Sequence, residues 1–126
     1  MSMELEILSA REYNVKLKAT IQASGKLGFT APTAKFMNFT PEGGIKFGRD
    51  SNGQLYLIYC PSCDEDTFKL YVSNGYYSVN TKVLFDNLGY DYVNQSIAFD
   101  LIRVPDEEQE IYKMMQRKSK NKNEDQ

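Results

Sequence analysis

Two stretches of this chain, about fifty residues apart, follow the same order of residue types. The first, GKLGFTAPTAKFMNFTPEGG, covers residues 25–44, and the second, GYYSVNTKVLFDNLGYD, covers residues 75–91. Each begins with glycine, passes through a short aromatic or apolar strand, reaches a polar cap and an apolar stretch, and has glycine again at or near its end. Phe36 then aligns with Phe85. Because each unit is too short to bury a core alone, the pattern predicts two repeats that share one core.

Periodic patterns divide the first half into strands, a turn and a helix. Residues 13–21 alternate apolar and polar side chains with the period of a half-buried strand, and Gly25 marks the turn that follows. Thr30 is suited to cap a short helix that begins near Pro32. Farther on, the pair Asn52-Gly53 lies between two strand-like runs and predicts a tight hairpin.

The second half follows the same order. The runs FKLYV and YYSV are strand-like and flank a tight turn at residues 73–75. Asn80 is suited to cap a short helix over residues 81–88. The run SIAFDLIRV, residues 96–104, predicts the last strand of the series.

A final helix is expected at the C-terminal end, because Pro105 and three acids after it are typical of a helix start. Its modest apolar stripe would consist of Ile111, Met114 and Met115. Apolar side chains of this kind could bind a protein partner or a second copy of the chain.

The fold class predicted is α+β and strand-rich, a small barrel built from two β-β-α-β-like repeats plus the C-terminal helix. Five parts are expected along the chain. They are an N-terminal segment (1–12), a basic repeat 1 (13–59), an acidic, Tyr-rich repeat 2 (60–104) sharing one core with repeat 1, the helix (105–118) and a disordered tail (119–126).

Charge is distributed unevenly along the chain, although the net charge is only −2. Residues 11–59 carry seven Lys or Arg against three acids, whereas residues 60–110 carry three against ten. One basic face could therefore meet an anionic partner while an acidic face lies elsewhere. The alternative is that both sets of charges form solvated surface without a partner.

The order of a strand, a turn with glycine and a basic residue, a strand, a short capped helix and a hairpin resembles the AbrB/SpoVT/MazE-type swapped-hairpin barrel. The matching residues in the first copy are Gly25, Lys26, Leu27, Phe29, Pro32 and residues 34–39. The second copy matches at Gly75, Tyr77, Val79 and residues 80–88 but lacks the basic residue and the proline. Two tandem copies would cover roughly residues 13–104 and could close the barrel within one chain.

The resemblance implies a non-enzymatic DNA-binding protein, a transcriptional regulator that uses basic residues at the turn and on neighbouring strands. Lysines 16 and 18 share the polar side of one strand. The chain contains few arginines, which are the favoured readers of base edges, so binding would depend on phosphate contacts and on salt. The DNA-binding residues expected are Lys16, Lys18, Lys26, Lys35, Lys46 and Arg49.

A second interpretation keeps nucleic acid as the partner but changes its form. Seven tyrosines could form a stacking surface for a single strand, as in binders of the PUR or PC4 type; the same rings could instead pack against the sheet. These residues are Tyr56, Tyr59, Tyr71, Tyr76, Tyr77, Tyr90 and Tyr92.

A third interpretation is a structural or adaptor subunit that binds protein, or assembles with itself, through repeat 2 and the C-terminal helix.

Motifs for enzymatic or metal chemistry are weak. Cys60 and Cys63 form a CPSC motif, but the chain has no other cysteine and no histidine to complete a zinc site. The acids after Cys63 would oppose a thiolate, and no histidine can activate a nucleophile. We therefore expect no enzyme activity, no metal and no cofactor.

The expected location is the cytoplasm, without a membrane partner. No apolar run approaches the roughly 20 residues of a membrane-spanning helix. The N-terminal residues include acids where a signal peptide would have basic residues.

Overall fold

The computed structural model describes residues 3–8, 16–106, 108–117 and 120–121. Short strands and two one-and-a-half-turn helices make up these regions. The strands are β1 (Lys18–Ile21), β2 (Leu27–Phe29), β3 (Gly44–Arg49), β4 (Leu55–Cys60), β5 (Phe68–Ser73), β6 (Tyr76–Val79), β7 (Gln95–Val104), β8 (Glu110–Gln116) and β9 (Lys120–Asn121). The helices are α2 (Ala31–Phe36) and α3 (Lys82–Asn87).

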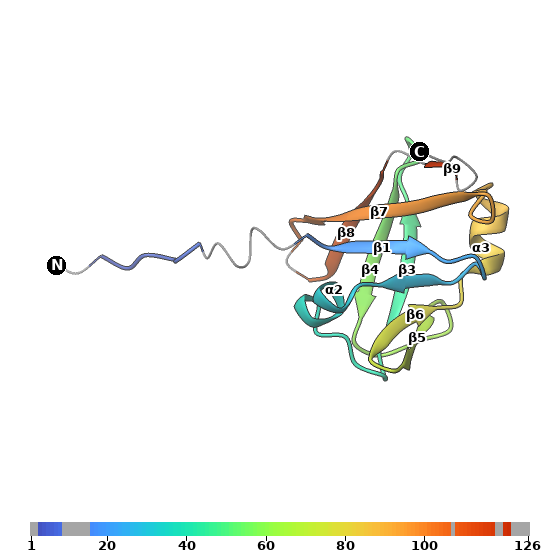
Figure 1. Cartoon of the computed structure of the whole chain (residues 1–126). Coiled ribbons are helices and arrows are strands. Elements are labelled where there is room, and N and C mark those ends of the chain that lie inside the picture. The colour runs from blue at the N-terminus through green and yellow to red at the C-terminus, as the bar shows by residue number, and fades with distance from the viewer. Residues whose placement is uncertain (1–2, 9–15, 107, 118–119, 122–126) are drawn as a thin grey trace.

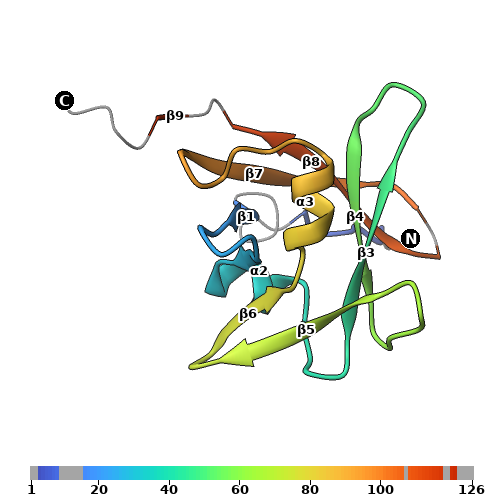
Figure 2. The same ribbon diagram turned by 90° about the vertical axis from the view of Figure 1, so that its right-hand side faces the viewer.

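Strands β1 to β8 close into an antiparallel barrel. Their order around it is β1-β2-β6-β5-β3-β4-β8-β7, and β7 pairs back with β1. Figure 1 shows β1, β2 and β6 in front of β3 and β4, and Figure 2 places β3 and β4 on the side away from β1. The short strand β9 is an addition to the closed ring and pairs with the first two residues of β7. The prediction of a small, strand-rich barrel is therefore confirmed.

The four hairpins of the barrel interleave. Hairpins β1–β2 and β3–β4 come from the first half of the chain, and β5–β6 and β7–β8 come from the second. Every other pairing in the barrel joins the two halves, at β2–β6, β3–β5, β4–β8 and β1–β7. The order around the ring stays the same when each strand of the first half is exchanged with its counterpart in the second half. The counterparts are β1 and β5, β2 and β6, β3 and β7, and β4 and β8.

The two helices end in the same way. The chain leaves α2 through Asn38 (φ 56°) and α3 through Gly89 (φ 83°), both in the left-handed region. The amide of the next residue, Phe39 or Tyr90, donates to the carbonyl five residues earlier, at 3.0 and 3.1 Å. This is the Schellman arrangement, which satisfies free carbonyls at a helix end.

The hydrogen bonds that end the two helices have acceptors 51 residues apart, the carbonyls of Ala34 and Phe85. Phe85 of α3 therefore corresponds in the structure to Ala34 of α2. The alignment of Phe36 with Phe85 is therefore displaced. Helix α2 begins as predicted, because the Thr30 side chain accepts from the Thr33 amide at 3.3 Å. Helix α3 begins one residue later than predicted, and its N-cap is Thr81 instead of Asn80.

Two clusters of aromatic rings fill the core. Phe39 packs against the rings of Phe29, Tyr59 and Tyr77, with centroids 4.9, 5.1 and 5.6 Å away. Phe85 of α3 is fully buried, and its ring lies 5.6 to 6.4 Å from those of three neighbours. These neighbours are Phe47, Tyr90 and Phe99. Helices α2 and α3 lie at opposite ends of the barrel (Figure 1).

The predicted C-terminal helix over residues 105–118 is wrong, because this region contributes strand β8, which pairs with β4 and β7. Tyr112 and Met114 point inward with strand periodicity and are buried. The pairing partners on both sides decide between strand and helix here, and no local pattern shows them.

The ends of the chain differ in part from the expected segments. Of the N-terminal segment, residues 3–8 are exposed and without regular secondary structure, and residues 9–15 lie outside the described residues. The first strand is described from Lys18 onward. Of the expected tail, only residues 120–121 are described, and they form β9.

Replacing Phe85 with alanine should lower the free energy of unfolding by about 3–5 kcal/mol, because a fully buried ring leaves a cavity among three other rings. Val83→Ala in the same helix is the control, since Val83 is 73% exposed and its loss should change stability by less than about 0.5 kcal/mol. Urea denaturation measures both values. Equal, small effects of the two substitutions would contradict the packing role of α3.

Candidate functional site

The six basic residues expected to bind DNA lie in three places. Lys16 and Lys18 are at the start of β1, and Lys35 is in the last turn of α2 at the same end of the barrel. Lys26 is at the β1–β2 turn, at the other end of the hairpin. The remaining two, Lys46 and Arg49, lie on β3. Because β3 is four strands from β1 in an eight-strand barrel, these two residues lie on the opposite side of the barrel.

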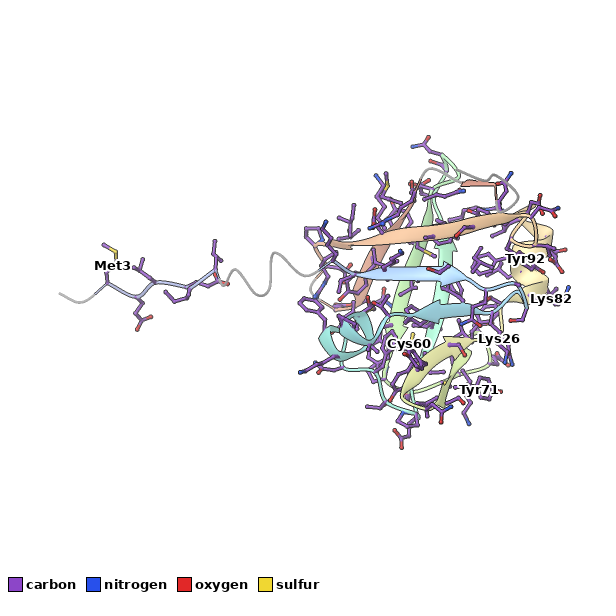
Figure 3. The ribbon with its side chains drawn as sticks, in the orientation of Figure 1. Met3, Lys26, Cys60, Tyr71, Lys82 and Tyr92 are labelled. Atoms are coloured by element: carbon purple, nitrogen blue, oxygen red, sulfur yellow. The ribbon has the colours of Figure 1, made fainter. Side chains whose placement is uncertain are left out.

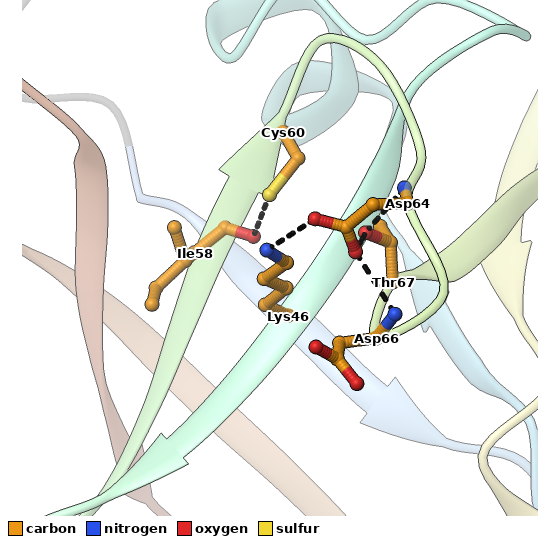
Figure 4. Close-up of polar contacts among 6 residues, drawn as sticks. All are labelled: Lys46, Ile58, Cys60, Asp64, Asp66 and Thr67. Atoms are coloured by element: carbon orange, nitrogen blue, oxygen red, sulfur yellow. Dashed lines mark hydrogen bonds and ion pairs between the residues drawn. The ribbon is translucent and has the colours of Figure 1, made fainter.

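Lys46 is also occupied by an internal partner. Its Nζ lies 2.7 Å from an oxygen of Asp64, which accepts further hydrogen bonds from the Thr67 hydroxyl and the Asp66 amide (Figure 4). These bonds, that from Lys46 first, lower the pKa of Asp64 to about 2, and the same bond raises the pKa of Lys46. Lys46 of β3 is therefore bound to the loop between β4 and β5.

The two cysteines are free thiols near this loop. The Cys60 thiol donates to the Ile58 carbonyl at 3.8 Å (Figure 4), and burial raises its pKa, so the neutral thiol is favoured. The Cys63 thiol donates to the Glu42 carbonyl at 3.6 Å. Within the described ranges, no three His, Cys, Asp or Glu side chains gather where they could hold a metal ion.

The outer surface of β1, β2, β6 and β5 combines lysines with exposed tyrosines. Along each strand the apolar residues alternate inward, so the polar ones point out. None of these outward residues is acidic. We call this surface the lysine–tyrosine face, and it consists of Lys16, Lys18, Thr20, Gln22, Lys26, Gly28, Thr30, Lys69, Tyr71, Ser73, Tyr76 and Ser78.

A groove of about 400 Å³ lies on this face, along the line where β2 pairs with β6. Gly28 and Ser78 pair with each other there, so the middle of the groove has only one small side chain. Lys26 of β2 and Tyr76 of β6 both line the groove, and the register of the two strands puts them toward its opposite ends. The arrangement offers a cation, hydroxyl groups and an aromatic ring around one hollow.

The two tyrosines of the face are exposed, and a third tyrosine beside the groove has a structural role. Tyr71 and Tyr76 are 50% and 66% exposed. Tyr77, which also lines the groove, is half-buried, and its hydroxyl donates to the Phe39 carbonyl at 3.3 Å. Figure 3 shows Lys26 and Tyr71 in the same part of the barrel surface.

Acidic residues border the lysine–tyrosine face at both ends. Asp100 of β7 is the cross-strand neighbour of Lys18 on β1, and its carboxylate forms an ion pair with Arg117 at 2.8 Å. At the other end, Lys82 packs over Gly25, and its Nζ is 2.8 Å from Asp86. Among the described residues, neither Lys26 nor Lys69 of the face forms an ion pair, although Lys69 follows the acidic turn at residues 64–66. Sequence patterns did not identify Lys69, because it belongs to the acidic half.

The residues expected at a protein interface lie on β8. Met114 is 2% exposed and belongs to the core, whereas Met115 is 38% exposed and Ile111 is half-buried. Met114 is thus not accessible to a partner, and the three residues do not form one exposed stripe.

Comparisons with known proteins give no further guidance. A scan against protein-family models, a search of curated proteins and a search of solved structures each find no match. Over the described residues, no helix has the length and apolar character needed to cross a membrane.

The lowered pKa of Asp64 should make stability depend on pH. Its folded value, about 2, is below the ordinary 3.8, so the unfolded chain takes up the proton first as the pH falls. The contribution is fully present above about pH 4 and is lost as the pH falls toward 2. Asp64→Asn should therefore show a smaller decrease in melting temperature between about pH 6 and pH 2.5 than the wild type. Glu65→Gln in the same loop is the control, and an unchanged decrease in Asp64→Asn would refute this role.

Proposed function

We propose that this protein binds nucleic acid through the lysine–tyrosine face. The observation that carries the proposal is the absence of acidic side chains from that face, which displays four lysines, in a chain whose net charge is −2. Phosphates would be attracted there and repelled by the acidic turns elsewhere. The four lysines are Lys16, Lys18, Lys26 and Lys69.

The contacts would be made mainly to the phosphate backbone. Lysine is a compact point charge on a flexible chain and suits phosphate without fixing a base sequence. The face contains no arginine to read a base edge with two hydrogen bonds. Binding would therefore weaken with salt because it releases counterions.

The order of strands supports an arrangement of two repeats like that of the AbrB/SpoVT/MazE type. Each half supplies two hairpins separated by a short helix, and the hairpins interleave as they would between two copies. The matching ends of α2 and α3 support the same interpretation. By this resemblance we propose DNA as the nucleic acid and transcriptional regulation, without enzyme activity, as the role.

The proposal predicts that lysines on the face control affinity and its salt dependence. Lys26→Ala and Lys69→Ala should each weaken binding to a random DNA duplex and reduce the slope of log K against log salt by about 0.9. Arg49→Ala is the matched control, because it removes one exposed charge from the opposite side of the barrel. Fluorescence anisotropy between about 50 and 200 mM salt measures all three.

Two results would overturn this proposal. One is an absence of binding to any nucleic acid at low salt. The other is an equal loss of affinity in Arg49→Ala and Lys26→Ala, which would mean that net charge matters and the face does not.

A further inference from the structure

We infer that the groove on the lysine–tyrosine face is a site for a single-stranded nucleic acid, in which Tyr76 stacks against a base. This inference rests on the proposed function and specifies the form of the ligand. It depends on three features of the groove: its exposed ring, its open floor and its position among the lysines.

The exposed ring is the first feature. Tyr76 is 66% exposed beside the groove, although burying an aromatic ring is favourable. Among the described residues its hydroxyl has no hydrogen-bond partner. A duplex hides the faces of its bases and presents phosphates to a flat surface, whereas a single strand can place a base flat on such a ring. The position of Tyr76 is therefore useful to a single strand and not to a duplex.

The open floor is the second feature. Gly28 lies across from Ser78, so these two paired residues add only one small side chain to the floor between β2 and β6. A Cβ at Gly28 would collide with the side-chain amide of Gln22, which lies over the glycine. Gln22 could move aside for a ligand or offer its amide to the edge of a base.

The surrounding charge is the third feature. Lys26 of β2 lines the groove at the end away from Tyr76, and the strand register puts Lys69 of β5 at that same end. Lys18 of β1 lies in the row of Tyr76, two strands away. Tyr71, 50% exposed on β5, extends the aromatic surface in the same direction. A strand that stacks one base on Tyr76 would thus keep its phosphates close to lysines. This combination of cations and exposed rings is how sequence-tolerant single-strand binders work.

Anisotropy with labelled oligonucleotides of about 12 nucleotides tests the inference. The probes are oligo-dT, oligo-rU and a random DNA duplex of equal length. The wild type should bind a single strand about tenfold more tightly than the duplex. Tyr76→Ala should lose about tenfold for the single strand and little for the duplex, whereas Tyr76→Phe, which keeps the ring, should retain binding.

Two further variants separate the groove from general effects. Gly28→Val should block the floor and weaken single-strand binding without changing charge, and the Gln22 side chain can move to admit the new methyl groups. Tyr56→Ala is the control, because Tyr56 lies on β4, four strands from β2 in the barrel. An unchanged melting temperature shows that each variant is folded.

The outcomes distinguish this inference from the proposed function. Salt-sensitive binding of the duplex as tightly as of the single strands, with no effect of Tyr76→Ala, would overturn the inference and leave nucleic-acid binding in place. No binding of any probe at low salt would overturn both. A preference for either oligo-dT or oligo-rU, lost in Tyr76→Ala, would support the inference and identify the polymer.

Discussion

The barrel depends on backbone pairing between the two halves of the chain. Among the eight described strands of the barrel, the pairs within each half are the two strands of each hairpin, and an isolated hairpin is at best marginally stable in water. The four other strand pairings of the barrel, here called seams, join one half of the chain to the other, and the β1–β7 seam closes the ring. The aromatic clusters inside can therefore be buried only when both halves are folded together. Two seams, β2–β6 and β3–β5, have just two residue pairs each.

The groove follows from one of these narrow seams. Where β2 meets β6, Gly28 pairs with Ser78, and the strands diverge beyond this short contact toward their own hairpins. A larger residue at position 28 would fill the hollow. The pairing of β2 with β6 places Lys26 from one half and Tyr76 from the other half in the lining of one groove. The candidate site thus belongs to neither half alone.

Local features of the fold could be predicted from the sequence, and features set by distant partners could not. The cap at Thr30, the turn at Asn52-Gly53 and the end of α3 at Gly89 depend on neighbouring residues and were predicted. Strand β8 was missed because Ile111, Met114 and Met115 fit helical spacing, while Tyr112 and Met114 fit strand spacing. Only its pairing with β4 and β7 decides between them.

The site could be predicted only in part for the same reason. Sequence separates a basic segment, 13–59, from an acidic one, 60–104, and this suggests two opposite faces. Interleaved hairpins mix the two segments around the barrel, so the lysines of β1 and β2 adjoin the tyrosines and Lys69 of β5 and β6. Lys46 and Arg49, although basic and early in the chain, lie on the other side of the barrel, on β3.

The acid-free character of the lysine–tyrosine face has a physical origin in how the turns are built. Several aspartates are used to hold turns, because a short carboxylate accepts hydrogen bonds from nearby backbone amides. In this way Asp50 accepts from two amides in the β3–β4 turn and Asp106 accepts from two before β8. The two turns that border the face instead reverse through Gly25 and through Asn74-Gly75, all with positive φ. Because these two turns need no carboxylate, they themselves add no negative charge to the borders of the face, and the acid near the Gly25 turn, Asp86, comes from α3 and is paired with Lys82.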